Sequence, residues 1–233
     1  MPFYEEWIEN KNTETEKRFI EYFLKLVPES TEVFHKGDDA EIGTAISVIN
    51  SVSIERYVEV IDTMTYDVQI EAAQVPQFSD FGDAIYRVPE LLEFAPKGTS
   101  FEKLGYQLVK SSTEGAGIKY GENHSKLAST MELVEITKRP SNVMSTALGK
   151  YLVRFMPDEK RDLLRRLALR QYMAQKIIHD AGCGIISYRE EVNHLSVTTA
   201  VRRRNNVRVY LEFILKDTQC EKRLSNIEWQ VKE

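Results

Sequence analysis

The stretch YGENHSKLASTMELVEITKRPSNVMS, residues 120–145, carries the signals that decide the fold. Its first part, 120–132, is predicted to be a helix, and 133–137 is rich in residues that favour a strand. Residues 138–142, KRPSN, are predicted to form a turn, after which 143–145 return to extended chain. The stretch therefore predicts a helix followed by a two-stranded hairpin with a basic tip.

Two further helices are predicted before this stretch. The first begins with Asp83 as its N-cap and runs to about Phe94, with apolar residues on one face. The second begins with a capping box, in which the Thr99 hydroxyl and the Glu102 carboxylate each satisfy a backbone N–H, and it runs to about Val109. Three helices followed by strand, basic turn and strand is the order of a winged helix-turn-helix unit. In such a unit the third helix fits a DNA major groove and the basic turn contacts phosphates.

The chain after this unit is predicted to be mostly helical. Residues 147–155 and 157–180 are expected to form two helices, and the second carries four arginines that lie mostly off its apolar stripe: Arg161, Arg165, Arg166 and Arg170. We expect these four to serve mainly solubility and pairing within the helix. A second capping box at 187–190 opens a short helix, and a last helix runs from 197 to about 216. Ser100, Phe101 and Leu108 have the same spacing as Ser187, Tyr188 and Leu195. This recurrence indicates that the second half of the chain repeats a unit of the first.

The first 80 residues have a different character. Residues 14–27 are predicted to form an amphipathic helix that Pro28 ends, and 29–43 are acidic and turn-like. Apolar and polar residues alternate over 66–71, which is typical of a strand. Residues 73–82 resemble a linker, so we place the domain boundary there.

These elements predict a mainly α protein with short β-strands (α+β), built from tandem winged helix-turn-helix units behind a small α+β N-terminal domain. The expected domains are an acidic N-terminal interaction domain over 1–80, a first winged-helix unit over 81–156, and a long helix with a second winged-helix-like unit over 157–233.

Composition narrows the class of protein. The chain has 233 residues, of which 42% are hydrophobic and 29% charged, as in ordinary globular proteins. No run approaches 18 apolar residues, and the acidic N-terminus has no signal sequence, so we expect no membrane association and a cytoplasmic location. The two cysteines, Cys183 and Cys220, cannot form a disulfide scaffold, which fits a reducing compartment.

Charge is distributed unevenly along the chain. Residues 1–100 hold 8 Lys and Arg against 20 Asp and Glu, a net charge of −12, whereas 101–233 hold 23 against 16, a net charge of +7. A basic half of this size is typical of a protein that binds a polyanion, most often nucleic acid. The acidic half is expected to contact a protein partner or to form a homodimer.

Nine side chains are the candidate nucleic-acid contacts, because they stand on the third helix, the wing tip and the last helix: Lys119, Asn123, His124, Lys126, Lys138, Arg139, Arg202, Arg203 and Arg208. Arginine is favoured at such sites because its planar fork binds phosphate or guanine through two hydrogen bonds. The alternative is that these arginines form a solvated helix face and pair with Glu190, Glu191 or Glu212.

Residues 199–214, TAVRRRNNVRVYLEFI, resemble the T-A-x-R-R helix ending in spaced aromatics that is found in winged-helix modules appended to bacterial restriction and defence-associated proteins. Residues 88–94, VPELLEF, are similar to the opening helix of such modules. Residues 131–135 and 145–149 are similar to the end of their third helix and to the L-T-x-x-G segment.

The resemblance covers about 84–216 and implies tandem winged-helix architecture with DNA contact. The chain departs from the pattern in three respects. Tyr210 and Phe213 stand where tryptophans are usual, Arg204 replaces a small residue, and Asn123-His124 replaces an aromatic pair.

Motifs of several enzyme classes are missing. His179, His194, Cys183 and Cys220 lack the spacing of zinc ligands, so no metal and no cofactor is expected. No nucleophile elbow, triad or P-loop is found. A magnesium-dependent nuclease would need carboxylates and a lysine on adjacent strands. Asp67 and Glu71 lie on the predicted strand, but Ala73 occupies the position where the lysine is needed.

We therefore expect a non-enzymatic protein that binds double-stranded DNA, either as a transcriptional regulator or as the DNA-recognition subunit of a bacterial defence or restriction-type system. The first alternative is a non-catalytic winged-helix docking subunit of a multi-protein machine such as a chromosome-organising ATPase complex. The second alternative is a magnesium-dependent nuclease subunit.

Overall fold

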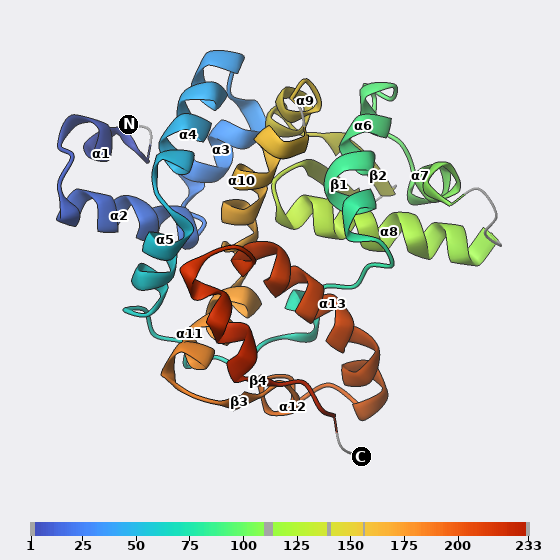
Figure 1. Ribbon diagram of the computed structural model, residues 1–233. Coiled ribbons are helices and arrows are strands. Elements are labelled where there is room, and N and C mark those ends of the chain that lie inside the picture. Colours follow the sequence, from blue (N-terminus) through green and yellow to red (C-terminus); the bar gives the residue numbers. More distant parts are fainter. Residues whose placement is uncertain (1–2, 110–113, 139–140, 156, 232–233) are drawn as a thin grey trace.

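The computed structural model describes residues 3–109, 114–138, 141–155 and 157–231. It is mainly helical, with two small two-stranded sheets, in agreement with the predicted α-dominated α+β class. Figure 1 shows the first five helices on one side and the β1–β2 hairpin with α6–α8 on the other, with α10 between them. Buried apolar residues from all these regions form one continuous core.

The first part of the chain contains five helices: α1 (Glu5–Glu9), α2 (Thr13–Leu24), α3 (Pro28–Lys36), α4 (Asp39–Ser51) and α5 (Ile54–Ile61). The predicted turn over 29–43 is wrong. Pro28 occupies the first turn of α3 instead of only ending α2, and Asp38 begins α4 through a capping box with Glu41. The acidic residues therefore stabilise helix N-termini.

The predicted strand over 66–71 is also wrong. This segment bends at Val68 and pairs with no strand in the described part of the chain. Its alternating apolar residues do not share one buried face, because Ile70 is buried while Val68 is exposed. Within the described residues, 3–80 contain helices, turns and irregular segments but no strand, so the part of the chain predicted to be a small α+β N-terminal domain is helical. Because Asp67 and Glu71 do not lie on a strand, the arrangement considered for a nuclease is not formed there.

The central part contains the predicted order of helices and hairpin. Its elements are a π-helical turn η2 (Asp83–Arg87), α6 (Val88–Glu93), α7 (Phe101–Leu108), α8 (Glu114–Thr130), β1 (Val134–Lys138) and β2 (Ser141–Ser145). The two strands are antiparallel, with Ile136 opposite Val143. Ser100, and not Thr99, is the N-cap of α7, while Thr99 forms a bridge with Val143.

Glycines allow α7 and α8 to approach closely. A Cβ atom on Gly105 of α7 would lie 1.8 Å from the carbonyl oxygen of Gly117, and one on Gly121 of α8 would lie 2.0 Å from that of Phe101. Only residues without a Cβ permit this backbone contact. The helix that carries four of the nine predicted DNA contacts is therefore packed closely against its neighbour.

The last part contains α9 (Ala147–Val153), α10 (Pro157–Ala168), α11 (Tyr172–Cys183), β3 (Ile186–Ser187), α12 (Tyr188–Glu191), α13 (Val197–Leu215), the 3-10 segment η3 (Gln219–Asn226) and β4 (Ile227–Glu228). The single helix predicted over 157–180 is interrupted at 169–171. The amide of Gln175 donates to the Leu169 carbonyl, which the interruption leaves without a helical partner.

The predicted duplication is not found. The strands β3 and β4 are parallel and two residues long, and 157–231 contain no antiparallel hairpin. Ser187 precedes α12 without a side-chain capping bond. In the part of the chain that the structure describes, no helix combines the length and the apolar character needed to cross a membrane.

Candidate functional site

Two of the three arginines of α10, Arg165 and Arg166, do not lie on a solvated face, whereas the side chain of Arg161 is 42% exposed. Arg165 donates from Nε and Nη2 to the Ile214 carbonyl at 2.9 and 2.7 Å, at the C-terminal end of α13. Arg166 donates from the same two atoms to the Val52 carbonyl at 2.9 and 2.7 Å, at the C-terminal end of α4. Both side chains are buried, and burial lowers the pKa of each. They satisfy carbonyls that a helix leaves unpaired at its end, so the expectation of a solubility role is wrong for them.

Arg170 is buried still more deeply, with a fully covered side chain. Its guanidinium lies over the rings of Phe23 and Phe34, donates to Ser30 Oγ at 3.1 Å, and has Nη1 3.5 Å from Glu132 Oε1. Burial lowers its pKa to about 10, so it remains charged at neutral pH.

The other oxygen of Glu132 lies 2.7 Å from His35 Nε2 on α3. This hydrogen bond is the main reason that the pKa of His35 is raised. His35, Glu132 and Arg170 therefore connect the N-terminal helices, the end of α8 and the α10–α11 junction. Their role is structural.

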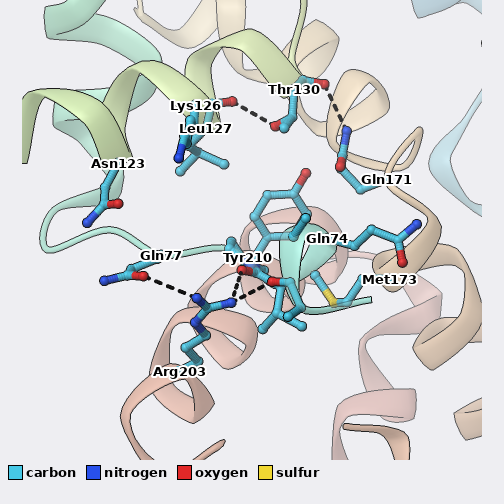
Figure 2. Close-up of a pocket in the computed structure, with 14 residues that line it drawn as sticks. Gln74, Gln77, Asn123, Lys126, Leu127, Thr130, Gln171, Met173, Arg203 and Tyr210 are labelled. Carbon is cyan, nitrogen blue, oxygen red and sulfur yellow. Dashed lines mark hydrogen bonds between the residues drawn. The ribbon is translucent and has the colours of Figure 1, made fainter. Parts of the chain in front are cut away.

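Three of the nine predicted contact residues meet at one cavity. The cavity of about 210 Å³ lies between α8, residues 72–77, the start of α11 and α13, and we call it the α8–α13 cleft. Figure 2 shows its polar side chains, which are Gln74, Gln77, Asn123, Lys126, Thr130, Gln171, Arg203 and Tyr210. None of the residues that line it is Asp or Glu, and all of them are among the described residues.

Arg203 holds one wall of the cleft in place. Its Nη1 donates to the carbonyls of Ala72 at 2.6 Å and Val75 at 3.2 Å, and its Nη2 donates to Gln77 Oε1 at 3.3 Å (Figure 2). Asn206, one turn further along α13, donates from Nδ2 to the Phe78 carbonyl at 2.7 Å. The segment 72–78, which overlaps the predicted linker 73–82, is thus attached to α13.

The opposite wall is α8. Lys119 Nζ and Lys126 Nζ each lie 2.7 Å from one oxygen of Glu122. Hydrogen bonds from Lys119 and then Lys126 lower the pKa of Glu122. One carboxylate therefore pairs with two cations, and the exposed face of α8 keeps an excess of one positive charge over these three residues.

His124 does not belong to that face. It is completely buried, stacks on Tyr120 at a ring separation of 3.9 Å, lies with Nδ1 2.7 Å from the Tyr120 carbonyl and accepts from Asp80 N–H. Burial lowers its pKa, so it is neutral at pH 7. The expectation that α8 exposes His124 is wrong, because 124 falls on the side of the helix that packs against the core.

The remaining predicted residues are scattered. Arg202 on α13 is exposed, and Arg208 pairs with Glu212 at 2.8 Å, which is the alternative that the sequence left open. Lys138 is the last residue of β1, opposite Ser141. The side chain of Lys138 and all of Arg139 lie outside the described residues, so the wing tip stays a prediction.

The sequence did not point to the glutamines of the cleft. Gln74, Gln77 and Gln171 belong to no motif, and they meet only because Arg203 holds 72–77 against α13. The available signal was the presence of two glutamines, at 74 and 77, within the predicted linker 73–82. Among the described residues, no group of three His, Cys, Asp or Glu side chains is arranged to hold a metal ion.

Comparisons of this chain with protein families, with curated proteins and with solved structures found no match. The winged-helix resemblance therefore remains a prediction, and the function is proposed from the residues of the chain itself.

Proposed function

We propose that this protein binds nucleic acid, with double-stranded DNA as its main partner, through the exposed face of α8 and the adjoining α8–α13 cleft. Its role would be that of a transcriptional regulator or of a DNA-recognition subunit without catalysis. The observation that carries this proposal is the convergence of Asn123, Lys126 and Arg203 on one cleft whose lining has no carboxylate. A polyanion meets cations and amide donors there without a repelling charge in the lining.

The order of helices and hairpin gives further support. The exposed positions of α8 include Lys119 and Lys126, and a helix of this kind fits a major groove. Glu122 competes with phosphate for these two lysines, because its carboxylate pairs with both. The proposal therefore predicts opposite effects on DNA affinity for neighbouring residues of α8: loss of the two lysines weakens binding, and loss of the Glu122 charge strengthens it.

The test is the binding of a labelled DNA duplex, measured by fluorescence anisotropy over a series of salt concentrations. Replacement of both lysines, K119Q with K126Q, should weaken binding and reduce the slope of log K against log salt by about two, one for each lost phosphate contact. Glu122→Gln should strengthen binding, because both lysines are released.

The pair Glu32–Lys36 on α3 provides a matched control, since it has the same spacing on an exposed helix. Glu32→Gln and Lys36→Gln should leave the affinity unchanged. Duplex binding that is independent of salt, or that responds equally to the α3 and α8 variants, would remove the proposal.

The docking-subunit alternative is favoured by a separate observation. Arg165, Arg166 and Arg170 are buried, so the basic charge of the rear half is less available at the surface than the sequence suggests. Co-purification with a larger subunit, together with no shift of free duplex, would support docking instead of DNA binding.

A further inference from the structure

The α8–α13 cleft has the size and polarity of a site for one small planar ligand. Its volume of about 210 Å³ suits a single heterocyclic ring system and not a folded peptide. Leu127, Met173, Val75 and Pro76 supply apolar walls, and amide side chains supply polar groups at several points (Figure 2). Apolar walls with a few polar groups that fix orientation are typical of small-molecule sites.

Several amide groups in the cleft are available to a ligand. Asn123 is half-buried and makes no side-chain hydrogen bond with the described part of the chain. Gln77 and Gln74 use their oxygens, which accept from Arg203 and from the Glu71 N–H. Gln171 uses its nitrogen, which donates to the Thr130 carbonyl at 3.0 Å. The cleft thus offers the Nδ2 and Oδ1 of Asn123, two further donors and one acceptor.

This pattern matches the edge of a nucleobase. An asparagine or glutamine amide presents a donor beside an acceptor, and so does a base edge, which such amides bind through two hydrogen bonds. Lys126 lines the same cleft, and its ammonium, which pairs with Glu122 at 2.7 Å, can exchange that carboxylate for a phosphate attached to the sugar of the base. A carboxylate ligand would use the lysine but would leave the donor–acceptor pair of Asn123 and the free amide nitrogens of Gln74 and Gln77 without complementary partners.

We propose that the α8–α13 cleft binds a single nucleobase, with Asn123 contacting the base edge and Lys126 the adjoining phosphate. The choice of a nucleobase as the class of ligand rests on the proposed function. The base-binding proposal adds that the bound base lies outside the base stack and is not read within a duplex. The same chemistry is present in a free mononucleotide and in an unpaired nucleotide of a strand, so the experiment separates these two sources.

The experiment measures binding of the full-length protein to four probes: nucleoside 5′-monophosphates, ribose 5-phosphate, a single-stranded oligonucleotide, and the same oligonucleotide with abasic positions. A base-binding cleft predicts that a mononucleotide binds at least tenfold more tightly than ribose 5-phosphate. If the source is a strand, abasic positions should weaken binding by a similar factor.

Asn123→Leu should reduce mononucleotide binding about tenfold, because it removes both hydrogen-bonding groups at similar size. Asn205→Leu is the control, since Asn205 is exposed on α13 and does not line the cleft. A thermal unfolding curve for each variant separates loss of binding from loss of fold. Gln77→Leu tests the same cleft from its opposite wall should Asn123→Leu fail to fold.

The outcomes separate the two proposals. Salt-dependent duplex binding that is unaffected by Asn123→Leu, with no mononucleotide binding, would overturn the base-binding cleft and leave the proposed function standing. Mononucleotide binding that Asn123→Leu abolishes, with no affinity for any strand, would support the cleft, identify a free nucleotide as the source, and overturn the proposed function.

Discussion

Two helices of this protein carry rows of arginines that look alike in sequence and serve opposite purposes. In α10 and the turn that follows it, Arg165, Arg166 and Arg170 are buried and donate to carbonyls and a hydroxyl of other segments. On α13, Arg202 and Arg208 are exposed, whereas Arg203 donates to the 72–77 segment and Arg204 donates to the Trp229 carbonyl at 3.4 Å.

The difference comes from what surrounds each helix. The helix α10 contacts α4, α5 and α13, and two of these end beside it with unpaired carbonyls. Beside the arginines of α13 lies the 72–78 segment, which accepts hydrogen bonds from Arg203 and Asn206. An arginine therefore becomes structural where a neighbouring helix ends, because a guanidinium can donate to several carbonyls at once. Three experiments test this comparison.

The largest effect is expected for Arg170→Ala. It removes a buried charge from Glu132 and from the faces of two phenylalanine rings, and it leaves a cavity. Removal of one partner from a buried ion pair typically costs about 3–5 kcal/mol, and we expect a loss of unfolding free energy in that range, measured by urea denaturation. A loss below about 1 kcal/mol would contradict the structural role. Coupling between Arg170→Ala and Glu132→Gln in a double-mutant cycle isolates the pair itself.

An intermediate effect should separate the two rows directly. Arg166→Ala deprives the Val52 carbonyl of a charged donor and should cost about 2 kcal/mol, whereas the exposed Arg202→Ala should change stability by less than about 0.5 kcal/mol. Arg203→Ala should lie between them, at about 1 kcal/mol. The measurement is the urea midpoint of each variant at unchanged slope. Equal losses for Arg166→Ala and Arg202→Ala would break the comparison.

The smallest effect is expected for His35, which is hydrogen-bonded to Glu132, the carboxylate that pairs with the buried Arg170. Glu132 raises the pKa of His35 above its usual 6.5, against burial and against the charge of Arg170, with Glu135 adding to the rise. A raised pKa means that protonated His35 stabilises the fold fully below pH 6.5. This contribution, about 0.5 kcal/mol, is lost as pH rises through the folded pKa.

Wild type and His35→Gln should therefore differ most near pH 5.5 and least near pH 8.5 in unfolding free energy. His124 is unchanged in both proteins, so its own titration, which has the opposite sign because its pKa is lowered, cancels from the difference. If the difference in unfolding free energy instead grew with pH, the pKa of His35 would not be raised by folding.

The sequence predicted the hairpin and its preceding helices well, because turn residues, caps and apolar spacing are local signals. It failed at Gly37-Asp38-Asp39, where a turn signature is in fact the junction of two helices and Asp38 is an N-cap. It also failed for Arg165 and Arg166, because a helical periodicity identifies an apolar stripe but not which other segments cover the polar side.

The candidate site was predictable only in part. Asn123, Lys126 and Arg203 were chosen for their residue type and element, and they do meet at one cleft. Their meeting depends on hydrogen bonds from α13 to residues more than a hundred positions earlier in the chain. No local pattern encodes such contacts, and for the same reason the glutamines of the cleft were missed.

The attachment of 72–78 to α13 has a consequence for anyone who alters the chain. A reporter sequence inserted at Asp67, which is exposed, would lengthen the chain at a point that does not line the cleft. The same insertion between Gln74 and Phe78 would displace carbonyls that Arg203 and Asn206 hold. The chain should thus tolerate an insertion near Asp67 but not one between Gln74 and Phe78, although the two sites lie only about ten residues apart. The position of this change marks where the chain becomes fixed to α13.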